Sequence, residues 1–113
     1  MTECIFCKIA AGEIPSSKIY EDQQMLAFKD INPAAPVHVL FIPKKHLANL
    51  GEMTAADEGL LGHMMAVVGK VALELGLTEG YRLVSNCGEK AGQSVNHLHF
   101  HLLGGRNLQW PPG

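Results

Sequence analysis

Three histidines alternate with apolar residues in one short stretch of the chain, at His97, His99 and His101. In an extended strand successive side chains point to opposite faces, so these three imidazoles would share one face. The intervening residues are all apolar and would share the other face, where they could enter a core. Packing gains nothing from three imidazoles in a row, whereas imidazole is the side chain best suited to chemistry near neutral pH. We therefore expect the histidine row to be catalytic.

The middle histidine, His99, is the candidate nucleophile. Histidine forms covalent intermediates, and a hydrogen bond at one ring nitrogen would fix the tautomer that leaves the other nitrogen free. The preceding loop offers backbone N–H groups, an amide and a hydroxyl in Gly92-Gln93-Ser94-Val95. Because glycine-containing turns with such donors bind anions, the pattern favours phosphorus over carbon as the electrophile. His38 and His101 could then donate to phosphoryl oxygens as charge builds in the transition state.

Cys4 and Cys7 have the CxxC spacing of a redox pair or of half a zinc site. Nothing around them resembles the βαβ unit of a thioredoxin, which argues against the redox pair. Zinc needs two more ligands, which His46 at a strand end and His97 on the outer side of the row could supply. Two thiolates and two imidazoles would make a closed, structural site. Two reduced cysteines without a metal are the open alternative.

A catalytic metal on His97, His99 and His101 is a further alternative, in which the ion would activate water. Ligands at positions i, i+2 and i+4 of a strand span roughly 13 Å, too far to converge on one ion. The geometry of a strand therefore disfavours it. Asp30, after another predicted strand, could accept hydrogen bonds from sugar hydroxyls or only stabilise its own turn.

The bulk composition indicates one globular domain over residues 1–113. The chain is long enough for one core and too short for two, and it is 47% hydrophobic and 18% charged. A net charge of −2 gives no basic field for a nucleic-acid backbone. No apolar run approaches the roughly 18 residues of a membrane span, and no secretory signal is evident. We expect a cytoplasmic protein with reduced cysteines that binds neither nucleic acid nor membrane.

Five strands should position these residues. Segments 17–22 and 25–29 read as a hairpin around a polar turn, 37–42 is the most apolar strand, and 81–85 is a short strand before the histidine row. The fold class that follows is α+β with a five-stranded antiparallel sheet.

Two helices complete the expected domain. A short one over 4–11 ends at Gly12. A long one begins at the N-cap Thr54, with Asp57 as a capping-box partner, and ends at Gly76. Its apolar residues recur every three or four positions and form a stripe for the core: Leu60, Leu61, Met64, Val67, Val68, Val71 and Leu75.

The stretch from His97 to Leu103 resembles the His-x-His-x-His-x-x signature, with apolar x, of the histidine triad (HIT) family. The similarity covers nearly the whole chain and is closest to the Hint branch in segments 5–9, 13–15, 27–31, 35–38, 42–46, 80–82, 92–95 and 103–106. The segment Trp110-Pro111-Pro112-Gly113 is a further mark of that branch.

This resemblance implies a HIT-like fold and a homodimeric purine nucleoside phosphoramidase. Such enzymes hydrolyse the P–N bond of adenosine or guanosine 5′-phosphoramidates, including adenylylated lysine, and need no cofactor for catalysis. By position, His99 matches the nucleophile that takes the nucleotidyl group before water attacks. His38 and His101 match histidines that contact phosphate, and Ser94 matches a hydroxyl near the leaving amine.

The resemblance also implies a substrate pocket. Asp30 matches a ribose-binding carboxylate, and Trp110 would reach toward the site of the other subunit. The phosphate loop corresponds to Asn86, Gly92, Gln93 and Val95. The purine pocket corresponds to Ile5, Phe6, Ile9, Phe28, Ile31 and Leu40.

The paired cysteines depart from many Hint relatives and resemble a bacterial subset with a structural zinc site. In that subset the ligands correspond to Cys4, Cys7, His46 and His97. Two other functions stay open: a dinucleoside polyphosphate hydrolase of the same superfamily, and a non-enzymatic, nucleotide-binding regulatory module.

Overall fold

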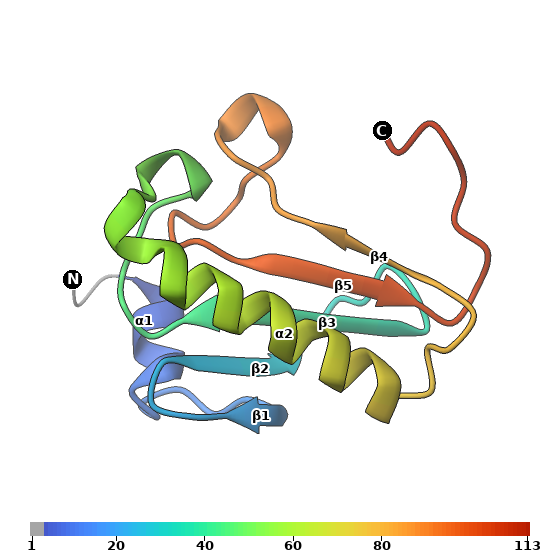
Figure 1. Ribbon diagram of the computed structural model, residues 1–113, viewed down its shortest axis with the longest axis horizontal. Coiled ribbons are helices and arrows are strands. Elements are labelled where there is room, and N and C mark those ends of the chain that lie inside the picture. The colour runs from blue at the N-terminus through green and yellow to red at the C-terminus, as the bar shows by residue number, and fades with distance from the viewer. Residues whose placement is uncertain (1–3) are drawn as a thin grey trace.

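A five-stranded antiparallel sheet forms the centre of the structure, a computed structural model that describes residues 4–113. Its spatial order is β1-β2-β3-β5-β4, so the last strand lies between β3 and β4 (Figure 1). The prediction of five antiparallel strands is confirmed. Their bounds are β1 Lys18–Glu21, β2 Met25–Lys29, β3 Val37–Pro43, β4 Tyr81–Val84 and β5 Phe100–Gly104.

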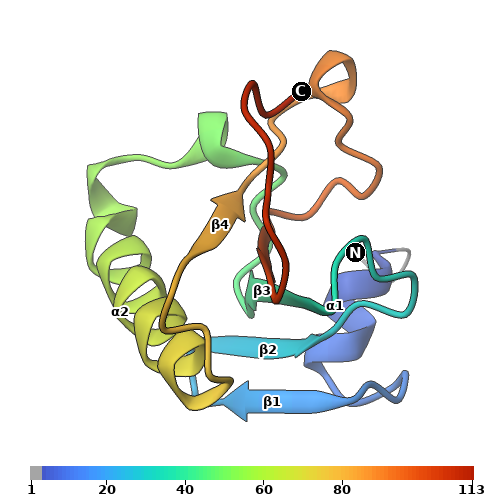
Figure 2. The ribbon, with the colours of Figure 1, turned by 90° about the vertical axis from the view of Figure 1, so that its right-hand side faces the viewer.

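The two helices lie on opposite faces of this sheet, as Figure 2 shows. The long helix α2 (Glu58–Glu74) covers one face, and the short helix α1 (Ile5–Ala10) covers the other. Strand β3 alternates between two cores: Val39 and Phe41 pack with α2, whereas Leu40 and Ile42 pack with α1. This alternation follows from the two-residue period of a strand. The sheet therefore separates a large core from a smaller one beside α1.

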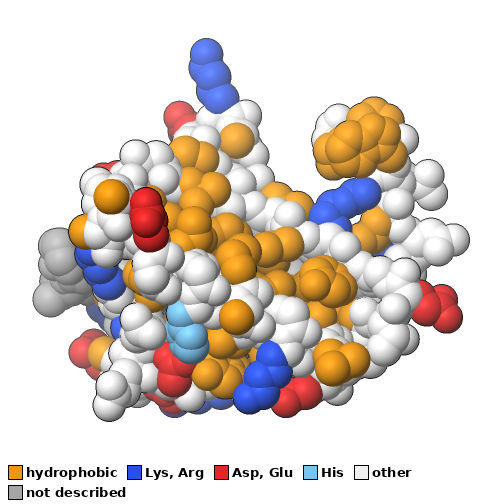
Figure 3. Space-filling model, viewed as in Figure 1, with side chains coloured by type: hydrophobic (Ala, Val, Ile, Leu, Met, Phe, Trp, Pro, Cys, Tyr) orange, Lys and Arg blue, Asp and Glu red, His pale blue; other side chains and the backbone are white. Residues whose placement is uncertain are grey.

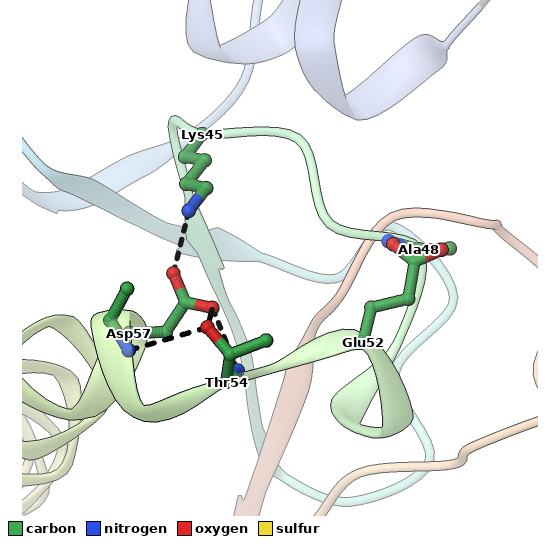
Figure 4. A network of polar contacts seen from close by, with 6 residues as sticks. Lys45, Ala48, Glu52, Thr54 and Asp57 are labelled. Atoms are coloured by element: carbon green, nitrogen blue, oxygen red, sulfur yellow. Dashed lines mark hydrogen bonds and ion pairs between the residues drawn. The ribbon is translucent and has the colours of Figure 1, made fainter.

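The start of α2 is fixed by the predicted cap, although the α-helix itself begins later than expected. Thr54 and Asp57 form a capping box around a single 3₁₀ turn, and α2 follows from Glu58. The buried Asp57 carboxylate also accepts a hydrogen bond from Lys45 Nζ at 2.6 Å (Figure 4). At the other end Gly76 has a φ of 80°, the left-handed conformation that glycine adopts readily after a helix.

The histidine row is only partly a strand, which corrects the prediction. Strand β5 begins at Phe100, so His97 and His99 precede it. Continuing the β3–β5 register past Phe41↔Phe100 would set Leu98 opposite Pro43, which has no N–H to donate to the ladder. The Leu98 N–H instead donates to the Leu47 carbonyl at 2.6 Å.

The two faces of the row are nevertheless as predicted. The intervening apolar residues Leu98, Phe100 and Leu102 are buried in the α2-side core. The rings of His97 and His99 meet the α1 residue Phe6 edge-on, with centroids 5.9 and 5.1 Å away.

No helix within residues 4–113 is long and apolar enough to cross a membrane.

Candidate functional site

A cavity of about 290 Å³ opens between α1, the end of β2 and the histidine row. It brings together most of the predicted substrate and catalytic residues: Ile5, Phe6, Ile9, Phe28, Asp30, Ile31, Leu40, Ser94, Val95, His99 and His101. It also includes the segment 14–17 and Lys29, to which the sequence had given no role. Most of its lining side chains are apolar, and the polar ones include Asp30, Ser94, His99 and His101.

His99 has the tautomer that a nucleophile requires. Its ring is 96% buried, and Nδ1 lies 2.7 Å from the carbonyl oxygen of His97. A carbonyl only accepts, so Nδ1 carries the proton and Nε2 keeps a free lone pair. The neighbouring backbone therefore leaves Nε2 as the nitrogen of His99 that could attack an electrophile.

Asp30, His38 and His101 form a second group of side chains, which we name the relay cluster. The Ala34 N–H donates to His38 Nδ1 at 2.9 Å, so the His38 proton resides on Nε2. That Nε2–H lies 2.9 Å from His101 Nδ1 and 3.4 Å from an Asp30 carboxylate oxygen. Since His101 accepts at Nδ1, its own proton is on Nε2. The hydrogen bonds therefore run in one direction, from the Ala34 N–H to His38 and from His38 to His101, which lines the cavity.

Burial keeps His101 neutral. Desolvation, followed by the nearby imidazoles of His99 and His38, lowers the pKa of His101 to about 4. At neutral pH the ring therefore offers a hydrogen-bond donor without a positive charge.

The loop before the histidine row is held by Gln93, which is buried. Its Oε1 accepts from the Gly88 N–H at 2.8 Å, and its Nε2 donates to the carbonyls of Ala48 and Val95 at 2.7 and 2.9 Å. The side chain is thus committed to the loop itself and does not line the cavity. Gly92 turns the chain at a φ of 94°, which exposes Ser94 at the cavity edge.

Four other predicted residues are not among those that line the cavity: His38, Asn86, Gly92 and Trp110. The side-chain nitrogen of Asn86 lies beside Gly92, 3.9 Å from where a Cβ at that glycine would be. Trp110 is 79% exposed in the C-terminal segment, away from the cavity of its own chain. A role for Trp110 at another subunit's site stays a prediction.

Cys4, Cys7, His46 and His97 form what we name the metal cluster. Their ligand atoms lie within 4.8 Å of one another. The distances are 3.3 Å from Cys4 Sγ to His97 Nδ1, 3.2 Å from Cys7 Sγ to His46 Nδ1, and 3.1 Å between the two Nδ1 atoms. A tetrahedron with ordinary zinc bond lengths has edges of about 3.3 to 3.8 Å. The donor set and its spacing therefore fit zinc.

The tautomer of His97 also suits a metal. Its Nε2 lies 2.8 Å from the Pro43 carbonyl and must donate to it, which leaves the Nδ1 lone pair directed at the cluster. Cys4 caps α1 through its sulfur, which accepts from the Cys7 N–H at 3.3 Å. Burial and the adjacent Cys4 raise the pKa of the Cys7 thiol, a shift that a bound cation would oppose.

Neighbouring polar contacts hold the loop that carries His46. Lys45 is bound to Asp57 at the start of α2, and the Ala48 N–H donates to a Glu52 carboxylate oxygen at 2.8 Å (Figure 4). Because Gln93 binds the Ala48 carbonyl, the same loop is joined to the cavity loop. This role of Lys45 and Gln93 could not be predicted from residue types, since both act through backbone or capping contacts.

Comparison with known proteins agrees with this arrangement. The HIT domain family model matches residues 11–108. An uncharacterized HIT-like protein of Synechococcus elongatus is 56% identical over 111 residues, which is 98% of this chain and 97% of the relative.

Solved structures give the same result. A HIT family hydrolase from Legionella pneumophila superposes with a TM-score of 0.96 at 51% identity, covering 98% of this chain and all of the other. A histidine triad nucleotide-binding protein from Candida albicans gives 0.83 at 40% identity, covering 96% of this chain and 83% of that one. The family model and these relatives cover nearly the whole chain, so the chain belongs to the HIT domain family.

Proposed function

We propose that this protein hydrolyses the P–N bond of purine nucleoside 5′-phosphoramidates through a nucleotidyl intermediate on His99. The observation that carries the proposal is the His99 tautomer, which has Nδ1 bound to the His97 carbonyl and Nε2 free beside the cavity. The solved relatives that are named a hydrolase and a nucleotide-binding protein support this class of reaction and ligand.

In the first step the Nε2 lone pair of His99 attacks phosphorus and forms the N–P bond. The substrate nitrogen leaves with the electron pair of the P–N bond and takes up one proton. We assign Ser94 to hydrogen-bond this departing nitrogen. We assign His101 and His38 to the phosphoryl oxygens, where a donor is worth most as negative charge grows.

In the second step water attacks phosphorus, and the bond to His99 breaks with its electrons returning to Nε2. The water gives up one proton, so the proton taken up in the first step is released in the second. An anionic phosphoryl group raises the pKa of an adjacent imidazole. His101 is therefore better able to hold a transferred proton when the nucleotide is bound than in the free protein.

We further propose that zinc binds the metal cluster as a structural ion. When bound it would supply a cross-link between α1, the loop after β3 and the segment just before the nucleophile, through Cys4, Cys7, His46 and His97. Thiolate ligands persist in a reducing compartment, which supports the predicted cytoplasmic location.

A homodimer is the quaternary structure we propose. Strand β4 is an edge of the sheet, and edge strands invite pairing. Hydrophobic side chains gather on the face that carries α2 (Figure 3), and Leu73 of α2 and Tyr81 of β4 are 68% and 45% exposed. Sedimentation at equilibrium would measure the mass; a monomer at micromolar concentration would contradict the proposal.

The decisive test is turnover of a fluorogenic adenosine 5′-phosphoramidate by the wild type and by His99→Gly. We expect a loss of about 10⁴-fold or more in kcat, because the covalent route disappears. Zinc content and mass should be unchanged in the variant. Near-normal turnover would contradict the mechanism. A wild type that prefers a diadenosine polyphosphate, or binds nucleotide without turnover, would support one of the alternative functions instead.

A further inference from the structure

The hydroxyl of Ser16 is buried and makes no hydrogen bond within residues 4–113. Its Oγ is the one buried side-chain nitrogen or oxygen atom without a hydrogen-bond partner in the part of the chain that the structure describes. The other buried polar residues, such as His97, His99, Gln93 and Asp57, all have partners. A buried hydroxyl without a partner is unfavourable, so it points to a ligand that completes it.

Ser16 is one of the residues that line the candidate substrate cavity. It lies in the extended segment between α1 and β1 and lines the cavity together with Ile14, Phe6 and Phe28. These three neighbours are apolar and belong to the smaller core beside α1. Ser16 therefore supplies a polar group where most of the surroundings are hydrocarbon, as expected for a group that orients a ligand.

The strand register sets Ser16 beside Asp30. Lys18 pairs with Phe28, and the Lys29 N–H donates to the Ser17 carbonyl at 3.0 Å. The next residues on the two segments, Ser16 and Asp30, are therefore opposite one another. The Asp30 side chain is 19% exposed, whereas Ser16 Oγ is shielded from solvent.

We propose that Ser16 Oγ donates a hydrogen bond to ring nitrogen N3 of a bound purine. The inference rests on the proposed function and on the predicted role of Asp30 as the carboxylate that binds the ribose hydroxyls. In a nucleotide the base edge that adjoins the 2′-hydroxyl is the minor-groove edge, and its purine acceptor is N3. A hydroxyl beside the ribose carboxylate, among apolar side chains that suit a purine ring, would meet that edge. Since adenine and guanine both have N3, the contact anchors either purine.

The experiment measures nucleotide affinity by calorimetry on the zinc-loaded protein, with AMP, 3-deaza-AMP and 7-deaza-AMP as probes. Ser16→Ala should raise the Kd for AMP and for 7-deaza-AMP by roughly 5- to 10-fold, the usual effect of one neutral hydrogen bond. The Kd for 3-deaza-AMP, which lacks the acceptor, should not change. Ser16→Thr is the matched variant, because it keeps the hydroxyl and should retain most of the affinity for AMP.

Three results would overturn the inference. An unchanged Kd for AMP in Ser16→Ala would mean that the hydroxyl does not touch the nucleotide. An equal loss for AMP and 3-deaza-AMP would move the contact away from N3. A 2′-deoxy-AMP affinity that is insensitive to Ser16→Ala would move the contact to the sugar.

Because binding requires no turnover, the two proposals can fail separately. A wild type that binds AMP but hydrolyses no phosphoramidate would overturn the proposed function. A selective loss of AMP affinity relative to 3-deaza-AMP in Ser16→Ala would still support the Ser16 contact.

Discussion

The metal cluster brings two imidazoles close to two thiols, and the relay cluster brings two imidazoles close to a carboxylate, in both cases with ligand atoms within 4.8 Å of one another. The ring protons of the two clusters are nevertheless arranged oppositely. In the metal cluster, His97 donates Nε2–H to the Pro43 carbonyl and directs a lone pair at its neighbours. In the relay cluster, the Ala34 N–H occupies His38 Nδ1, so the nitrogen facing the neighbours carries a proton.

This difference decides which cluster suits a cation. A metal bound at His38 Nε2 would have to displace that proton, and the ring could not take it up at Nδ1 without losing the hydrogen bond from Ala34. The distances alone do not separate the two clusters; the backbone partner of each ring does. The hydrogen bonds of the rings therefore favour the metal cluster over the relay cluster as the site for a cation, in line with the proposed function.

The largest expected effect is on stability, from removing the thiolates with Cys4→Ser and Cys7→Ser together. A metal that binds only the folded state stabilises it, so its loss should lower Tm by on the order of 10–20 °C and abolish the zinc content found by elemental analysis. Cys87→Ser is the matched control, because Cys87 is exposed and lies outside the cluster. Zinc retained in the double variant would contradict the ligand set.

The second effect is on catalysis, from breaking the relay with His38→Ala. His101 Nδ1 would lose its donor, and we expect kcat to fall by about 10²-fold while zinc content stays the same. His63→Gln serves as control, since His63 lies on α2 and bonds to Asp22. Equal losses of zinc and activity in His38→Ala would show that the two clusters do not have separate roles.

The smallest expected effect is the pH dependence of stability due to His101. Its folded-state pKa is lowered from 6.5 to about 4, so between these pH values the unfolded chain binds more protons than the folded one. The free energy of unfolding should therefore fall as pH drops from 6.5 to about 4, by roughly 1–3 kcal/mol, and this contribution should level off below that. Denaturant titrations at several pH values should show this fall in the free energy of unfolding for the wild type and not for His101→Gln. The same pH dependence in both proteins would contradict the lowered pKa of His101.

Periodicity predicted most of the fold. The α2 stripe and the alternation of the histidine row follow directly from side-chain geometry, and the structure contains both. The start of β5 could not be predicted, because it depends on which residue of β3 would stand opposite Leu98. That residue is Pro43, and its missing N–H matters only once the register is known.

The candidate site divides in the same way. Residue types and spacing predicted His99 as the nucleophile and Cys4, Cys7, His46 and His97 as metal ligands, and the structure brings those four ligand candidates together. Ser16 carries no such signal, because a serine after a proline reads as an ordinary loop residue until its burial is seen. The tautomers of His97 and His38 could not be predicted either, because their carbonyl and N–H partners depend on the tertiary structure.

His97 has a consequence for how the protein would respond to scarce metal. One residue presents its ring to the metal cluster and its backbone carbonyl to His99. Metal occupancy and nucleophile orientation would thus be set together in each molecule. In an active-site titration, partial metal loading should therefore lower the fraction of competent molecules, while each competent molecule keeps its full turnover rate. Zinc supply would then set the amount of active protein and not its kcat.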